Sequence, residues 1–250
     1  MRYLLFLSTL LSTSLFALVS IAPVDIGSKP GFSGNVSGSF SSKSGNTEKD
    51  EYTLGLRLQH DEGERYLVWG TVSYDYGESQ GTKNEDRTYA HVRYIHNLSE
   101  NEWCGELFVQ TEQDEFKDIN DRSLVGAGVR WRFFNSSEWG RGYAGLGGFY
   151  ETIDYAHPAL NPEEENERVN LYIAYTKSFA QASKLSYVGY YQPKFDDGSD
   201  YVSSQTLELI VPIYGKLNLS LTAAYNYDSR PPVGIKGKDT ALKTSLVWSF

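Results

Sequence analysis

Apolar and polar residues alternate along most of the chain after its first thirty residues. Segment 217–227, for example, reads LNLSLTAAYNY and places Leu, Ala and Tyr at odd positions, with Asn, Ser and Thr at most of the even ones. A period of two puts alternate side chains on opposite faces of a β-strand. This pattern recurs, so we predict an all-β chain of about twelve strands. The predicted strand segments are 31–40, 52–60, 65–76, 87–98, 102–112, 122–134, 142–152, 168–178, 184–192, 204–213, 216–228 and 241–250.

The connections between these segments alternate between short and longer, more polar stretches. The short ones are 61–64, 98–101, 135–140, 180–183 and 214–216. The longer ones are 43–49, 77–86, 114–121, 156–167, 195–200 and 228–239. Tight turns at one rim and loops at the other are typical of a transmembrane antiparallel up-and-down β-barrel. An even number of strands brings both termini to the short-turn rim, which is periplasmic in bacterial outer-membrane barrels.

The apolar faces carry aromatic residues near the ends of the strands, where the two membrane–water interfaces would lie. A soluble β-sandwich is the alternative, but it would give a less regular alternation of loops. Beyond the N-terminal segment no stretch of 18 residues is apolar, and Cys104 is the single cysteine, so no internal disulfide can form. A net charge of −9 argues against a nucleic-acid partner.

The N-terminus resembles a secretory signal peptide. Met1 and Arg2 form a short basic start, and residues 3–20 are apolar with scattered Ser and Thr. Small residues offer several cleavage sites between positions 17 and 22, and a membrane-anchoring helix is the alternative. We therefore expect residues 1–22 to be a signal peptide and residues 23–250 to form a single barrel domain.

Catalytic chemistry finds little support in the sequence. The histidines are His60, His91, His96 and His157, and no local His/Ser/Asn motif of the known barrel hydrolases is present. An inward His91 beside a serine of a neighbouring strand is the best enzymatic arrangement. We expect no enzyme, no catalytic residue, no cofactor and no resident metal.

Two loop segments are strongly acidic, namely 163–167 (EEENE) and 196–200 (DDGSD). They suit Ca²⁺, or divalent ions that bridge to the phosphates of lipopolysaccharide. Negative loops that are simply solvated are the plainer interpretation.

The polar faces of the strands are more informative because they would line the lumen. Charged side chains at these inward positions are the candidate pore-lining groups. They are Arg57, Arg93, Glu106, Arg130, Arg132, Glu208 and Lys243.

The short turns also predict how these charges pair. Glu106 would lie opposite Arg93 on one neighbouring strand and opposite Arg130 on the other. In a second row, Glu208 and Lys243 would flank Thr222. No long inward loop is evident that would narrow the lumen. A narrow charge-lined pore and a closed, salt-bridged barrel both fit these observations.

The chain ends on an alternating apolar strand with Leu246, Trp248 and Phe250 on one face. A terminal Phe in this setting resembles the signature of bacterial outer-membrane barrels, which the barrel-assembly machinery reads. Closing the sheet also needs this strand to pair with the first one, because an open edge in lipid leaves backbone groups unsatisfied. The expected location is the bacterial outer membrane, and the expected partners are its lipid, its lipopolysaccharide and the assembly machinery.

Residues 41–61, which read SSKSGNTEKDEYTLGLRLQHD, resemble the family known as domain of unknown function 481. The matching features are a Gly-rich first strand, the SGNT turn at 44–47 and a Leu-alternating strand, and the similarity extends over residues 31–250. The family is described as salt-induced outer membrane proteins. The resemblance implies an outer-membrane barrel and brings no activity, catalytic residue or cofactor.

Three functional hypotheses follow. The first is a narrow passive channel for ions or small polar solutes. The second is a closed structural or stress-related barrel, active in salt or osmotic stress, whose acidic loops form a surface. The third, which the missing hydrolase motif disfavours, is an outer-membrane lipid hydrolase.

Overall fold

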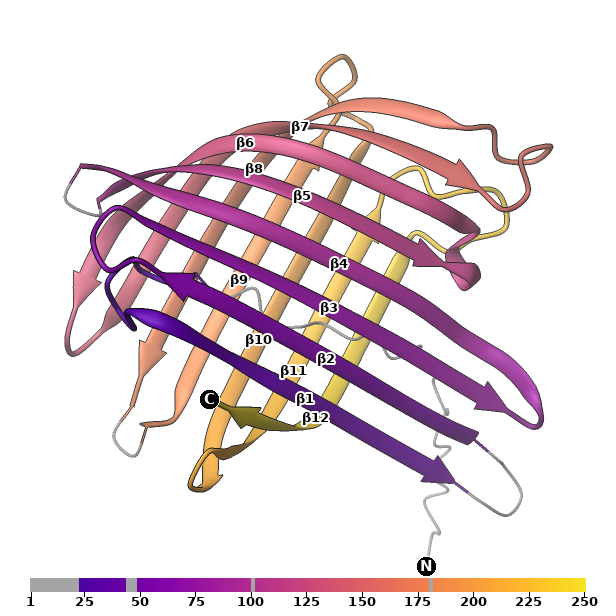
Figure 1. Cartoon of the computed structure of the whole chain (residues 1–250). Coiled ribbons are helices and arrows are strands. Elements are labelled where there is room, and N and C mark those ends of the chain that lie inside the picture. Colours follow the sequence, from indigo (N-terminus) through magenta and orange to yellow (C-terminus); the bar gives the residue numbers. More distant parts are fainter. Residues whose placement is uncertain (1–22, 44–48, 100–101, 180–181) are drawn as a thin grey trace, which may run out of the picture.

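A computed structural model describes residues 23–43, 49–99, 102–179 and 182–250. Over these residues the chain forms a closed antiparallel barrel in which each strand pairs with the next and the last pairs with the first (Figure 1). The fold class predicted from the alternation is confirmed. The strands are β1 (Gly31–Lys43), β2 (Lys49–Asp61), β3 (Tyr66–Ser79), β4 (Thr82–Ser99), β5 (Trp103–Asp114), β6 (Ile119–Ser136), β7 (Gly140–Tyr155), β8 (Glu164–Ser178), β9 (Lys184–Pro193), β10 (Tyr201–Tyr214), β11 (Leu217–Asp228) and β12 (Lys238–Ser249).

The outer surface of the barrel is apolar and the inner surface is polar. Strand after strand exposes a large apolar side chain outward; Leu54 is 60% exposed, Val125 57% and Leu242 76%. Inward positions hold buried charged groups such as Arg57 and Glu151. This distribution is the reverse of a soluble protein and is that of a barrel in lipid.

Aromatic side chains form clusters near both rims of the outer surface. Trp103 and Trp131 stack with ring centroids 5.7 Å apart close to the short turns. Tyr191, Tyr201 and Tyr227 lie side by side near the loops, with successive centroids 5.1 and 5.7 Å apart. Two such belts suit the two interfaces of a bilayer.

The connection predicted at 77–86 is shorter than expected. β3 continues to Ser79 and β4 begins at Thr82, so the turn consists of Gln80 and Gly81. Both have positive φ, 51° and 71°, as in the two-residue turns whose twist matches that of the flanking strands. The polar residues on either side therefore extend the strands beyond the apolar band. A short 3₁₀ helix, η1 (Glu115–Lys117), lies in the next connection at the loop rim.

The barrel closes through a short seam. β1 and β12 share four residue pairs among the described residues, from Asn35↔Ser249 to Gly38↔Leu246, whereas β1 and β2 share thirteen. Phe250 extends this seam, because its N–H donates to the Gly34 carbonyl (2.9 Å) and its carbonyl accepts from the Gly34 N–H (3.0 Å). A Cβ atom at Gly34 would lie 2.5 Å from the Arg57 backbone carbonyl oxygen and 2.9 Å from the Phe250 ring, so the close approach needs glycine.

Both the described N-terminal segment and Phe250 lie at the short-turn rim, as predicted for an even number of strands (Figure 1). The predicted signal peptide, residues 1–22, lies outside the described residues. Among the residues that are described, no helix is long and apolar enough to cross a membrane.

Candidate functional site

The lumen is the candidate site, and all seven predicted side chains lie on its wall. Five of the seven residues are less than 9% exposed. Arg132 and Lys243 are more accessible but contact other inward groups. The five are Arg57, Arg93, Glu106, Arg130 and Glu208.

A layer of charges and rings crosses the middle of the barrel. Glu106 lies 3.5 Å from Arg93 and 3.6 Å from Arg130, and it accepts a hydrogen bond from the Tyr172 hydroxyl (2.8 Å). The Arg93 guanidinium also lies over the Phe108 ring, 5.1 Å from its centroid. This layer joins side chains of β4, β5, β6 and β8 inside the barrel.

The predicted partners of Glu106 are right, but the predicted register is wrong. Glu106 lies directly opposite Ile95 and Gly128, two positions away from Arg93 and Arg130. β4 remains paired up to Ser99↔Trp103, beyond the strand end predicted at residue 98, and this offsets the β4–β5 ladder from the pairing that a connection at 98–101 would set. The long side chains of the arginines bridge the diagonal.

The second predicted row has the expected register, with Glu208 and Lys243 both opposite Thr222. The charged side chains of Glu208 and Lys243 nevertheless contact other residues. Glu208 accepts from the Ser220 hydroxyl (2.8 Å), and Lys243 Nζ lies 3.4 Å from Asp75 Oδ1. Arg57 sits over the Trp69 ring, 4.2 Å from its centroid, and so faces the same middle layer.

Segment 23–30, which precedes β1, enters the lumen at the short-turn rim. Ile26 is 4% exposed and packs against Leu67, Trp69, Ile95 and Cys104. These apolar side chains point inward at one end of an otherwise polar lumen, and Ile26 completes their cluster. The lumen is therefore narrowed by the segment before β1, which the search for a long inward loop did not identify.

Polar contacts fix this segment on both sides of Ile26. Asp25 pairs with Arg141, lies 3.5 Å from Arg132 and accepts from the Tyr143 hydroxyl (2.8 Å). Arg130 donates to the Val24 carbonyl (3.2 Å).

Asp61 holds the far side of the segment, because it accepts from the backbone N–H groups of Gly27 (2.9 Å) and Lys29 (3.1 Å). The space between Pro23 and the middle layer has a volume of about 10 Å³, room for about one water. Segment 23–30 thus occupies the short-turn mouth of the described barrel.

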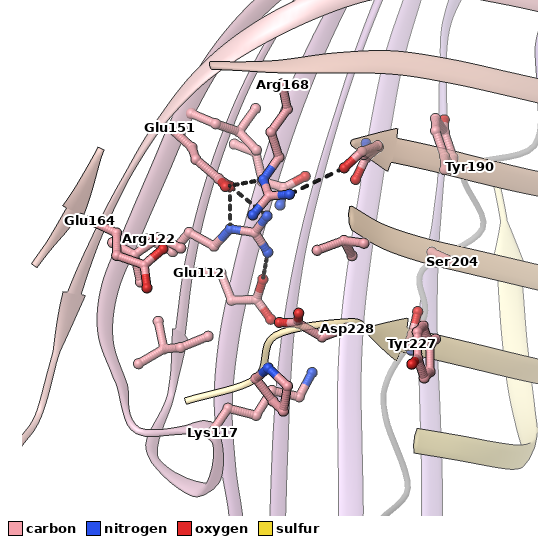
Figure 2. A pocket seen from close by; sticks show the side chains of 18 of the residues that line it. Glu112, Lys117, Arg122, Glu151, Glu164, Arg168, Tyr190, Ser204, Tyr227 and Asp228 are labelled. Atoms are coloured by element: carbon pink, nitrogen blue, oxygen red, sulfur yellow. Dashed lines mark hydrogen bonds and ion pairs between the residues drawn. The ribbon is translucent and has the colours of Figure 1, made fainter. Parts of the chain in front are cut away.

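The opposite half of the lumen is hollow. A cavity of about 240 Å³ lies between the middle layer and the loops of the other rim. Figure 2 shows its charged wall: Glu151 sits between Arg122 and Arg168 at 2.6 Å from each, and Arg122 also faces Glu112.

The chain of ion pairs continues in both directions along the wall. Arg87 donates to Glu112 (2.8 Å) at one end. At the other, Asp200 lies 3.1 Å from Arg168 and 2.8 Å from Lys194. Apart from Asp200, which belongs to the acidic segment 196–200, the sequence analysis placed none of these residues in a site, although several occupy inward positions of the predicted strands.

Side chains of three loops contact one another above this cavity. Asp118, just after η1, accepts from Asn161 Nδ2 (2.6 Å) and pairs with His157, and Asn161 Oδ1 accepts from the Val233 N–H (2.7 Å). Desolvation acts to raise the pKa of Asp118, but the hydrogen bonds from His157 and Asn161 hold it below its ordinary value. The three loops concerned form a roof over the loop-rim mouth.

The loop 194–200 joins the same roof. Asp197 accepts from the Ser199 hydroxyl (2.6 Å) and from Arg230 (2.7 Å). Hydrogen bonds from Ser199 and then Arg230 lower the pKa of Asp197 to about 2. The acidic segments 163–167 and 196–200 thus contribute to ion pairs, and no group of three metal-ligating side chains is assembled within the described ranges.

His91 lies on the floor of the cavity. Its ring stacks on Trp69 with centroids 4.9 Å apart, and Nδ1 lies 3.4 Å from Gln110 Oε1. This side-chain amide, not a serine, is its hydrogen-bond partner among the described residues.

An apolar exterior, a charged lumen and closure through the terminal Phe250 define the class as an outer-membrane β-barrel. Within that class the chain belongs to the family described as "Protein of unknown function, DUF481", whose sequence model matches residues 36–250. The resemblance noted from residues 41–61 is confirmed.

Solved structures share the barrel fold at low identity. The translocator domain of autotransporter NalP from Neisseria meningitidis is 10% identical, with a TM-score of 0.46 over 88% of this chain and 87% of that one. The β-domain of the Bordetella autotransporter BrkA is also 10% identical, with a TM-score of 0.42 over 88% and 98%. Such scores carry no argument about function. No curated protein was found to match the chain.

Proposed function

We propose that this protein is an outer-membrane channel for small polar solutes whose periplasmic mouth is closed at rest by segment 23–30. The apolar outer surface and the two aromatic belts support insertion in a bilayer. The lipid of that membrane, its lipopolysaccharide and the barrel-assembly machinery are the proposed partners. Leu246, Trp248 and Phe250 are the proposed assembly signal, since they face outward at the closing seam.

The single observation that carries the proposal is the way segment 23–30 is attached. Asp25 is buried and is held by Arg132, Arg141 and Tyr143, and Arg130 and Asp61 bind the backbone of the segment. All these contacts are made by side chains, because the segment precedes β1 and is not part of the sheet. The segment can therefore leave and return without opening a strand pair.

Once the segment leaves, the middle layer becomes the narrowest part of the path. Glu106 stands there between Arg93 and Arg130, so a cationic excess faces the passing solute. Charged rings of this kind set ion selectivity in pores. We propose no catalytic role, because His91 is engaged by Gln110 and packed against Trp69.

A permanently closed structural barrel is the second candidate. The roof of loops joined through Asp118, Asn161 and Val233 favours it, because the roof would have to move before a solute enters. A stress-related role of the acidic loops belongs to this candidate.

Single-channel recording of the refolded protein in planar bilayers separates the two candidates. We expect rare openings in the wild type and an open probability about tenfold higher in Asp25→Asn, because a hydrogen bond to a charged group is lost. Asp196→Asn, in an exposed loop, is the matched control and should behave as wild type. Silence of both the wild type and Asp25→Asn, with heat-modifiable folded protein in hand, would favour the structural barrel.

A further inference from the structure

The hollow half of the lumen has the properties of a binding site. The chain of ion pairs forms its wall (Figure 2). Its floor is the middle layer, and the loop around Pro231 and Ile235 forms its roof. Its volume of about 240 Å³ is below the range of about 300–1,000 Å³ that drug-sized ligands occupy. The cavity therefore suits a molecule of monosaccharide size.

The charges of the wall already compensate one another. Each of Arg122, Glu151 and Arg168 faces at least one opposite charge, and the chain runs without a break from Arg87 to Lys194. An ionic ligand would have to separate one of these pairs or remain uncompensated, which is costly in a buried setting. A neutral ligand with many hydroxyl groups can add hydrogen bonds to charged groups without breaking a pair.

Neutral hydrogen-bonding groups with spare capacity face the same space. His91 lines the same space, but its Nε2 atom is buried beneath the surface and out of a ligand's reach. Ser204 and Asn226 are opposite one another on β10 and β11, and the structure gives neither side chain a hydrogen bond to a described residue.

The cavity also has apolar faces. Phe108, Phe149 and Tyr190 line it beside the polar groups, and Ile235 adds an aliphatic surface from the roof. Sugar rings present C–H faces between their hydroxyl groups, and flat aromatic side chains with a polar neighbour suit both parts.

From this combination we propose that the cavity binds a neutral polyhydroxylated molecule, a monosaccharide or a polyol of similar size. Ser204 and Asn226 supply hydrogen bonds, and Phe149 and Tyr190 supply the apolar faces. This ligand class would also be the class of solute that the proposed channel carries, and in that respect the inference rests on the proposed function. Binding at the site itself does not require conduction.

Equilibrium binding to the refolded full chain tests the proposal, in a detergent without a sugar headgroup. Titration calorimetry with D-glucose and with D-sorbitol is expected to give saturable binding to the wild type. Glycine betaine and sodium gluconate serve as a zwitterionic and an anionic probe and are expected to bind at least tenfold more weakly. Stronger binding of either charged probe, or no saturable binding of both neutral probes, would overturn the proposal.

Variants locate the binding. Asn226→Leu removes one side-chain amide, and Ser204→Ala removes one hydroxyl; each should weaken binding about fivefold, the effect of one neutral hydrogen bond. Ser186→Ala, an inward serine at the other end of the lumen, is the matched control and should bind as wild type. Equal affinity in all three variants would place the sugar elsewhere and overturn the assignment.

The two proposals fail separately. If the protein conducts ions but does not bind sugar, only the proposed solute class is wrong. If it binds sugar but neither the wild type nor Asp25→Asn conducts, only the proposed channel activity is wrong.

Discussion

The two ends of the lumen are built from the same alternating strands and yet differ in content. At the short-turn end the chain fills its own barrel, with Ile26 in an apolar cluster and Asp25 among arginines. At the loop end the wall consists of ion pairs that surround a cavity. The difference teaches that an inward charge is satisfied in two ways here, by a segment from outside the sheet or by an opposite charge on the next strand.

The largest effect is expected at the loop end, from Glu151→Gln. Glu151 is fully buried and lies 2.6 Å from both Arg122 and Arg168, so the change leaves two buried cations short of a partner. We expect the free energy of unfolding to fall by about 3–5 kcal/mol, measured by urea denaturation of the barrel in micelles. Glu163→Gln, in an exposed part of the neighbouring loop, is the control. An unchanged urea midpoint would mean that the ion pairs do not hold the wall together.

At the short-turn end, Ile26→Ala should loosen the segment and leave the barrel intact. Loss of a buried isoleucine side chain costs about 2 kcal/mol or more, which raises the local opening of segment 23–30 roughly 30-fold. Hydrogen exchange of the Gly27 and Lys29 amides, which donate to Asp61, measures this opening. The urea midpoint of the barrel should stay near that of the wild type. Equal losses in both measurements would show that the segment and the barrel unfold as one unit.

Glu106→Gln sharpens the comparison at the layer between the two ends. The change leaves the charges of Arg93 and Arg130 less compensated. The ratio of anion to cation permeability should therefore rise, by roughly a few tens of per cent to severalfold. Reversal potentials in a salt gradient, recorded in the Asp25→Asn background, measure the shift. A reversal potential equal to that of the parent would remove Glu106 from the narrowest part of the path.

The smallest effect is expected in the roof, as a function of pH. Because the pKa of Asp197 is lowered to about 2 in the folded loop, its contacts with Ser199 and Arg230 contribute stability above the ordinary pKa of about 3.9. That contribution is lost as the pH falls from about 4 to 2. Hydrogen exchange in loop 229–237 should therefore rise over this window beyond its intrinsic pH dependence. In Asp197→Asn this additional rise in hydrogen exchange should be absent. If the wild type and the variant show the same pH profile, the rise is not due to Asp197.

The barrel was predictable because every strand meets lipid on one face and water on the other, so the period of two is strong in all of them. The turn at Gln80 and Gly81 was missed because polar residues beyond the apolar band still pair as strands. The position of Ile26 was not predictable from local pattern, since segment 23–30 has no period and its place depends on arginines more than a hundred residues away. One signal was present, namely the surplus of inward arginines at the short-turn ends of β6 and β7.

The register of the inner charges was out of reach for a related reason. β4 pairs on to Ser99↔Trp103, beyond its predicted end, and this moves the facing positions by two without leaving a mark in the alternation. Long side chains such as Arg93 tolerate the shift and still meet Glu106. The composition of the middle layer was therefore predictable and its geometry was not.

Only the four-pair seam between β1 and β12 closes the sheet into a cylinder. This seam lies towards the short-turn rim, where Phe250 and Gly34 exchange two hydrogen bonds. Towards the loop rim the two ribbon edges separate in the way Figure 1 shows, so backbone groups there rely on solvent or headgroups for hydrogen bonds. Heat or mechanical force should therefore separate β1 from β12 starting at the loop end. The backbone pair between Gly34 and Phe250 should be the last part of the seam to open.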